Sequence, residues 1–278
     1  MQSTRPRPAA IALNTVTVRE RWKLAQAVEG CVRHGIGGIT VWRHEVAALG
    51  VSAAARLLHG SGLVVTGLAR GGPFPWTDAR TRRAAIDDTL RAIDEAAELR
   101  ARCLILVVGG LAAGSRDLPG ARRMVRDAIG EVLDHARRSG VALALEPFHP
   151  MYCADRSCIS TLAEANDLCD ELGEGLGIAV DVYHVWWDPD LEAEIERAGR
   201  TRLLALHLSD WLVPTTDIAL DRGMMGDGII DIPRIRALME ANGFEGFHEV
   251  EIFSARNWWL RDPDEVLTIC KERHQSHC

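Results

Sequence analysis

Gly246-Phe247-His248-Glu249-Val250-Glu251-Ile252-Phe253 is a mostly apolar segment near the C-terminus that carries two glutamates at alternate positions. A short apolar run that begins at a glycine predicts a buried β-strand, and alternate residues of a strand face the same side. A buried acid is costly unless it is paired with another group. Glu249 and Glu251 therefore require partners from elsewhere in the chain.

Three earlier apolar runs also end in a polar residue. Residues 141–146 end in Glu146, residues 177–181 in Asp181 and residues 203–207 in His207. Strand patterns alternate with helical patterns along the whole chain, in eight units of about 30 residues. This alternation predicts an α/β fold, a single closed (β/α)₈ TIM barrel, with the active site at the C-terminal ends of its strands.

The expected barrel spans residues 9–278 and follows a flexible tail, residues 1–8. An open, doubly wound sheet is the alternative fold, but no glycine-rich dinucleotide fingerprint follows the first strand. Ser160 is expected to cap one helix, Asp188 another and Asp262 the last. The expected strands are 9–13, 37–41, 63–67, 103–108, 141–146, 177–181, 203–207 and 246–253, and the expected helices include 22–34, 51–59 (closed by Gly60), 160–172, 188–195, 232–241 and 262–274.

The bulk composition favours a small-molecule substrate. A formal charge of −7 argues against nucleic acid or an anionic membrane surface as the main partner. No apolar run is long enough to cross a bilayer. Seven cysteines without a Cys-x-x-Cys pair suit a reducing compartment, so we expect a cytoplasmic protein. The sequence leaves open whether the chain forms a homo-oligomer.

The four strand ends predict a metal site. In a barrel, Glu146, Asp181, His207 and Glu251 meet at the same face. Three carboxylates would repel one another without a cation, whereas a divalent ion offsets the repulsion. Three oxygen ligands and one imidazole suit Mn²⁺, Mg²⁺ or Co²⁺, and Zn²⁺ is disfavoured.

Counting back two residues from the first three ligands gives alanines, at positions 144, 179 and 205. The corresponding residue on the last strand is Glu249. It is either an acid that supports the ligands from the layer below the metal or a buried glutamate paired with a core arginine or histidine.

Several motifs resemble, in order and spacing, those of the xylose isomerase-like TIM-barrel superfamily, which contains the sugar phosphate isomerases and epimerases. The resemblance covers nearly the whole chain. It is carried by Leu145-Glu146-Pro147, Asp181-Val182-Tyr183-His184, His207-Leu208-Ser209-Asp210, Gly226-Asp227-Gly228-Ile229-Ile230-Asp231 and Glu249-Val250-Glu251-Ile252-Phe253.

The resemblance implies a Mn²⁺-type ion held by Glu146, Asp181, His207 and Glu251, with the two glutamates also moving protons. It implies that His184 contacts a substrate oxygen. In the sugar epimerases an arginine closely follows the metal-binding histidine, whereas this chain has Trp211-Leu212-Val213 there. Arg222, from the longer loop, is the candidate to replace that arginine.

The expected chemistry is proton abstraction beside a carbonyl. A metal that chelates the carbonyl and its neighbouring hydroxyl stabilises an enediolate, and Glu146 and Glu251 remove and return the proton. This predicts a sugar, keto-sugar or cyclitol isomerase or epimerase. A dehydratase or β-eliminating lyase acting on a keto-sugar, keto-inositol or 3-keto-glycoside would use the same residues, and the sequence does not separate these outcomes.

Two rival functions have less support. A DNA-repair enzyme of the endonuclease IV type would need more histidine and aspartate ligands at the first four strand ends and a basic groove. A silent binding barrel would have lost a ligand, and all four are present.

Further substrate-binding candidates lie in segments that follow strand ends. Aromatic rings suit a pocket wall for sugars, and arginines suit a phosphate or carboxylate. Arg70 opens a Gly/Pro-rich loop at residues 70–75, and Arg43 and Arg156 lie on the same face. The remaining candidates are Trp42, Trp186, Trp211, His149 and Asp210.

Overall fold

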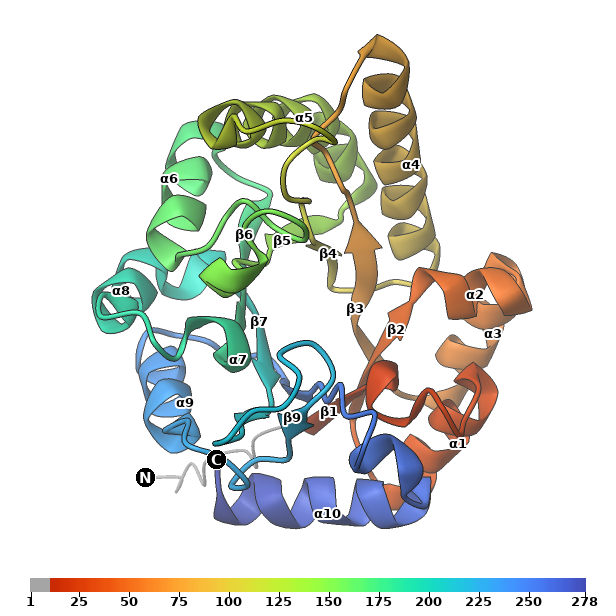
Figure 1. The fold of residues 1–278 in the computed structure, drawn as a ribbon. Helices are drawn as coiled ribbons and strands as arrows, with labels where there is room; N and C mark the ends of the chain where they lie inside the picture. The colour runs from red at the N-terminus through yellow and green to blue at the C-terminus, as the bar shows by residue number, and fades with distance from the viewer. Residues whose placement is uncertain (1–10) are drawn as a thin grey trace, which may run out of the picture.

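Eight of the apolar runs form the parallel strands of a closed barrel in the computed structural model, which describes residues 11–278 (Figure 1). The ring order is β1-β10-β7-β6-β5-β4-β3-β2, which confirms the predicted TIM barrel. The expected tail, residues 1–8, lies outside the described residues, so the domain bounds stay a prediction. The strands are β1 (Ile11–Asn14), β2 (Gly38–Trp42), β3 (Val64–Gly71), β4 (Cys103–Leu106), β5 (Ala142–Leu145), β6 (Leu176–Asp181), β7 (Leu203–Leu208) and β10 (His248–Val250).

Helices surround the ring of strands (Figure 1). Their apolar faces pack on the outside of the barrel and form the larger part of the core. Across residues 11–278, none is both long and apolar enough for a membrane span. The α-helices are α1 (Leu24–His34), α2 (Arg43–Leu49), α3 (Val51–Ser61), α4 (Ala79–Glu98), α5 (Leu118–Ser139), α6 (Leu162–Leu172), α7 (Val182–Val185), α8 (Leu191–Arg202), α9 (Ile232–Ala241) and α10 (Pro263–Ser276), and the 3₁₀ helices are η1 (Thr15–Val18), η2 (Pro150–Tyr152) and η3 (Trp258–Leu260).

The structure moves several predicted helix boundaries. Asp262 caps α10 as expected, accepting the backbone N–H groups of residues 264 and 265. Ser160 is not the cap of α6, because the hydroxyl of Thr161 accepts the N–H of Glu164 instead. Asp188 does not cap α8, which begins later, at Leu191. The left-handed residue that ends α3 is Gly62, so the predicted Gly60 lies inside the helix. Such shifts of one or two residues are common at helix ends.

Small side chains line part of the barrel interior. Ala144, Ala179 and Ala205 cluster with Cys103 and Ile105 inside the ring, separately from the core that the helices cover. The expected small residues are therefore inside the barrel. They leave space for larger polar groups at the C-terminal end of the strands.

Counting back two residues from each strand end does not identify the residues that lie at the same height inside the barrel. The ladder pairs Glu249 with His207, whereas the count had aligned Glu249 with the alanines. Ala179 pairs with Ala205, but Ala144 pairs with Gly177. Strands in a closed barrel are tilted and staggered, so equal distances from strand ends are not equal heights. The expectation that Glu249 lies in the same layer as the three alanines is therefore wrong, because Glu249 pairs with His207.

A small hairpin that the sequence patterns did not predict follows β7. Its strands β8 (Asp210–Trp211) and β9 (Arg222–Gly223) pair antiparallel. The N–H of Arg222 also donates to the carbonyl of Phe253 at 2.9 Å. The hairpin thereby brings Arg222 from a long loop to the strand end that carries Glu251.

Two buried histidines connect β10 to α10 and should make stability depend on pH. His248 Nδ1 lies 3.0 Å from His274 Nε2. Burial lowers the pKa of His248 to about 3 and that of His274 to about 4. Both rings are neutral in the folded chain at pH 5, while the unfolded chain takes up protons below its pKa of about 6.5. Each ring should therefore lower the free energy of unfolding by about 2 kcal/mol between pH 7 and pH 5.

Urea unfolding at the two pH values measures this effect. His274→Gln keeps a hydrogen-bonding group but removes one titration, so its loss of stability between pH 7 and pH 5 should be smaller. His59→Gln, at an exposed position of α3, is the control and should behave as the wild type does. An equal loss in His274→Gln and wild type would contradict the assignment.

Candidate metal centre and substrate pocket

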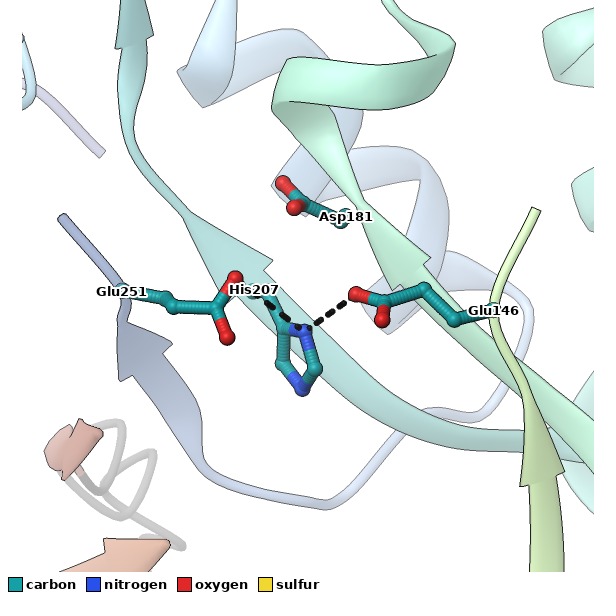
Figure 2. A group of neighbouring side chains, drawn as sticks. All are labelled: Glu146, Asp181, His207 and Glu251. Carbon is teal, nitrogen blue, oxygen red and sulfur yellow. Dashed lines mark hydrogen bonds and ion pairs between the residues drawn. The ribbon is translucent and has the colours of Figure 1, made fainter. Parts of the chain in front are cut away.

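Four predicted ligands meet at the C-terminal end of the barrel (Figure 2). Asp181 ends β6 and His207 lies in β7, while Glu146 and Glu251 directly follow β5 and β10. All four are buried, and one ligand atom from each lies within 4.8 Å of the others. Glu146 and Glu251 point toward each other from either side of the His207 ring, with Nδ1 lying 2.9 Å from Glu146 Oε1 and 3.9 Å from Glu251 Oε2.

The donor set fits a divalent cation. Burial raises the pKa of Glu146 and raises that of Glu251 to about 8, which shows how strongly the site opposes uncompensated negative charge. A hard divalent ion relieves this cost, and oxygen ligands with a single imidazole match Mn²⁺, Mg²⁺ or Co²⁺. The residues that would hold the ion are Glu146, Asp181, Glu251 and, through Nδ1, His207.

Arg222 supplies a buried positive charge beside this cluster. Its Nη1 donates to Asp181 Oδ2 at 2.8 Å and to Glu251 Oε2 at 3.1 Å. Burial opposes ionisation of Asp181, yet its pKa lies below the usual value because the positive charge of Arg222 favours the carboxylate. Three carboxylates would be balanced by this guanidinium and one divalent ion together. Arg222 therefore belongs to the charge balance of the centre.

Glu249 lies on the other side of the histidine ligand. Its Oε1 is 3.5 Å from His207 Nε2, the ring nitrogen that faces away from Glu146. Thr40 and Thr66 donate to Oε2 at 2.6 and 3.2 Å. The contact between Glu249 and His207 is at an ion-pair distance without a hydrogen bond. Of the two alternatives, the position favours an acid that supports a metal-binding residue, because metal-binding histidines commonly direct their second nitrogen to a carboxylate.

Asn14 is a site residue that the sequence patterns missed. Its Nδ2 donates to Glu249 Oε1 at 2.8 Å and to Glu251 Oε1 at 2.9 Å, and its Oδ1 accepts from Trp42 Nε1 at 2.8 Å. The available signal was a polar residue directly after the first apolar run, where the expected strand had been ended at Leu13. Asn14 holds in place both Glu249 of β10 and Glu251, which directly follows that strand.

Replacing Glu249 by Gln should weaken metal binding. The amide keeps the size of the side chain but removes the negative charge near His207 Nε2. Loss of such a supporting carboxylate typically costs 10–100-fold in metal affinity, and we expect a decrease of about that size for Mn²⁺. Thr66→Val removes one hydrogen bond to Glu249 but leaves its charge, so it should change the affinity much less. Titration with Mn²⁺ measures both, and equal affinities in Glu249→Gln and wild type would refute this role.

A pocket of about 480 Å³ opens onto the centre. Of the residues predicted to bind metal or substrate, seven line it: Glu146, Glu251, Trp42, Arg70, Arg156, His184 and Arg222. Aromatic residues that the sequence reasoning did not select complete the wall: Phe148, Tyr152 and Phe253. Phe253 follows Glu251 by two residues and Phe148 follows Glu146 by two, so the alternation of side-chain direction near a strand end was the available signal.

His184 is held as a neutral ring with one free N–H. It stacks on Phe148, with ring centroids 4.0 Å apart, and burial lowers its pKa to about 3. Arg222 Nη2 lies 3.2 Å from His184 Nε2, and a guanidinium can only donate, so Nε2 accepts and the proton resides on Nδ1. Nδ1 has no hydrogen-bond partner among residues 11–278.

Four other substrate candidates do not line the pocket. Trp211 stacks on Tyr183 at 4.7 Å, near Trp186 and His149, in an aromatic cluster. The Asp210 carboxylate accepts the backbone N–H groups of Trp211, Gly226, Gly228 and Ile230. The structure thus corrects the assignment of Asp210, which orders the loop after β9 instead of facing the substrate.

Arg43 does not line this pocket either. Its guanidinium is paired with Asp88 and Glu95 of α4, with closest distances of 2.7 Å to each. These carboxylates satisfy its charge, so the structure corrects the suggestion that Arg43 binds a substrate anion.

Known proteins share this architecture. Protein SMc04130 from Sinorhizobium meliloti 1021 is 56% identical, over 97% of this chain and 98% of that one, with a TM-score of 0.95. The IolI protein with a bound zinc atom is 18% identical (96% and 97% covered, TM-score 0.83), and the 3-keto-D-glucoside 4-epimerase YcjR from E. coli is 18% identical (97% and 100% covered, TM-score 0.77). The last two likenesses show a common fold.

A curated relative is matched over part of its length. The inosose isomerase of Halalkalibacterium halodurans is 22% identical over 154 residues, which are 53% of this chain and 52% of that protein. The matched segment thus spans about half the length of this relative. The profile of the xylose isomerase-like TIM barrel family, by contrast, matches residues 28–269, most of the chain. This protein belongs to the xylose isomerase-like TIM barrel family.

Proposed function

We propose that this protein is a divalent-metal-dependent isomerase or epimerase of a sugar, keto-sugar or cyclitol. The observation that carries the proposal is the pair of glutamates, Glu146 and Glu251, which point toward each other across the His207 ring and both line the pocket (Figure 2). The names of two relatives, an inosose isomerase and a 3-keto-D-glucoside 4-epimerase, support the same class of reaction.

The metal in this proposal is held by Glu146, Asp181, His207 and Glu251, with Mn²⁺ as the first candidate. When bound, such an ion polarises a carbonyl and its neighbouring hydroxyl and so makes the adjacent C–H more acidic. Glu249 supports the His207 ring from the Nε2 side, and Arg222 contributes a positive charge beside Asp181.

Glu146 and Glu251 move the proton. One carboxylate takes the proton from the carbon beside the carbonyl, and the electron pair of the broken C–H bond passes toward the carbonyl oxygen. Return of a proton to the opposite face of the same carbon gives an epimer. Return to the former carbonyl carbon gives an isomer, in which the proton of the neighbouring hydroxyl passes to the former carbonyl oxygen and the neighbouring carbon becomes the new carbonyl. Both carboxylates line the pocket, so each is positioned to reach a C–H group of a substrate bound there.

Other side chains position the reacting groups. Asn14 Nδ2 and Arg222 Nη1 donate to different oxygens of Glu251, which fixes the plane of that carboxylate. The free Nδ1–H of His184 is the donor that we assign to a substrate oxygen. Trp42, held by its bond to Asn14, provides an apolar wall for the C–H face of a sugar.

Deuterium exchange tests the proposal. The full chain is incubated in D₂O with Mn²⁺ and a panel of aldoses, ketoses, keto-sugars and inososes, and NMR follows the C–H positions beside each carbonyl. We expect deuterium to enter one such position, and excess chelator should stop this. Loss of water or of an alcohol with formation of a C=C bond would identify the lyase alternative. Neither exchange nor elimination with any compound, in a folded protein shown to bind Mn²⁺, would contradict the proposal.

We also propose that the protein works in the cytoplasm. All seven cysteines are free thiols, five of them buried, as suits a reducing compartment. Fractionation of the source cells with an antibody against the chain tests this, and recovery with exported proteins would contradict it.

A further inference from the structure

Arg70 is directed into the pocket by an irregularity of β3. The ladder between β3 and β4 pairs Ala69 with Ile105 and Gly71 with Leu106, so Arg70 is the extra residue at a register shift. The expected strand had ended at Gly67, with Arg70 in a loop. Bulges near active sites change the direction of a side chain, and here Arg70 lines the pocket. Its side chain makes no hydrogen bond or ion pair within the described part of the chain.

Arg156 lines the same pocket from the loop after η2. Two backbone hydrogen bonds of 2.9 Å hold it: its N–H donates to Tyr152, and its carbonyl accepts from Gly109. Its guanidinium lies 5.4 Å from the centroid of the Tyr152 ring. The nearest carboxylate is that of Asp155, 4.0 Å from Nε and 67% exposed, which is too distant for a hydrogen bond. Arg156 is therefore well placed but weakly paired.

The two guanidinium groups are close enough to disfavour each other. Burial lowers the pKa of Arg70, the charge of Arg156 lowers it further, and Glu146 acts in the opposite direction. Other arginines that are largely shielded from solvent form ion pairs with carboxylates. Arg43 pairs with Asp88 and Glu95, and Arg222 pairs with Asp181 and Glu251. No such carboxylate is placed against Arg70, although removing an unpaired cation from water carries a cost.

The three carboxylates that would bind the metal would be balanced by Arg222 and one divalent ion. The fourth buried carboxylate, Glu249, lies on the Nε2 side of His207 and does not line the pocket, so neither Arg70 nor Arg156 is paired with it. A guanidinium presents several donors in a planar fork that matches carboxylate and phosphate oxygens, and two such forks on one pocket wall form a receptor for an anion.

We propose that the substrate of this centre carries an anionic group, a carboxylate or a phosphate ester, which Arg70 and Arg156 bind while the carbonyl end faces Glu146 and Glu251. This inference rests on the proposed function, which concerns the carbonyl group of the substrate. It adds the chemical class of the substrate group that lies farthest from that carbonyl. It predicts that neutral sugars bind more weakly than their acidic or phosphorylated counterparts.

Anion binding is measured first, without turnover. The full chain is titrated with inorganic phosphate and with acetate at constant ionic strength in chloride, once with excess chelator and once with Mn²⁺, by calorimetry or ligand-detected NMR. We expect saturable binding of at least one anion in both conditions. Arg70→Met and Arg156→Met should each weaken it by about tenfold or more, as expected for loss of a charge-assisted hydrogen bond. Arg138→Met, at an exposed position of α5, is the matched control and should change nothing.

The two anions separate the two sources of the charge, because tighter phosphate binding indicates a phosphate ester and tighter acetate binding a carboxylic acid. No saturable binding of either anion, or equal binding in wild type, Arg70→Met and Arg156→Met, would overturn the inference. The deuterium exchange assay separates it from the proposed function. For this purpose the panel also contains the sugar acids and sugar phosphates that correspond to its neutral members. Exchange only with the neutral sugars would then refute the anionic substrate and leave the proposed isomerase activity intact. Arginine-dependent anion binding without exchange of any compound would support the anion site and contradict the proposed activity.

Discussion

Replacing Glu251 by Gln is expected to lower the rate of substrate C–H exchange in D₂O by about 10²- to 10⁴-fold, the usual contribution of a positioned acid or base. The amide keeps an oxygen that can face the metal and a group that can meet Asn14, but it cannot accept the substrate proton. Rates are therefore compared at saturating Mn²⁺, with the metal content of each protein measured. Glu146→Gln should lose a similar factor, because the return of the proton needs the second carboxylate.

The control for these variants is Glu98→Gln, on the surface at the end of α4, which should retain the wild-type rate. If Glu251→Gln binds Mn²⁺ and exchanges protons within a few-fold of the wild type, Glu251 is not the base. Loss of exchange in Glu251→Gln alone, with Glu146→Gln unaffected, would assign both proton steps to Glu251.

Replacing Arg222 by Met is expected to have the largest effect on stability. The guanidinium is buried and donates to Asp181 and Glu251, so its removal leaves two buried carboxylates without their cation. Breaking a buried pair in this way typically costs 3–5 kcal/mol, and we expect a loss of about that size in the free energy of unfolding when a chelator is present. Mn²⁺ should stabilise Arg222→Met more than the wild type, because the ion then faces less competing positive charge.

Urea unfolding with chelator and with Mn²⁺ measures both parts of this expectation. Arg197→Met is the comparison, since Arg197 pairs with Asp167 and Asp170 near the surface. Surface pairs contribute about 0–1 kcal/mol, so its loss should be small. Equal stabilities of Arg222→Met and Arg197→Met in chelator would show that Arg222 does not balance the centre.

Much of the fold was predictable because it depends on local periodicity. Alternating apolar strand and helix patterns indicated the closed barrel, and barrel topology places every strand end at one face. The polar residues that end the runs at Glu146, Asp181 and His207 could therefore be grouped with Glu251 before any contact was known. Helix ends were less predictable, since Ser160 and Thr161 are both good caps and only the backbone geometry selects Thr161.

The sequence by itself determined the architecture of this protein and which four polar residues cluster at the strand ends, because both follow from the order and period of residue types. Tertiary structure decided what the surrounding groups do. The register between β7 and β10 places Glu249 beside His207. The β8–β9 hairpin brings Arg222 close to the predicted metal centre. The register shift in β3 directs Arg70 into the pocket. These outcomes depend on strand register and loop path, which bring together residues far apart in the chain and leave no periodic signal in the sequence.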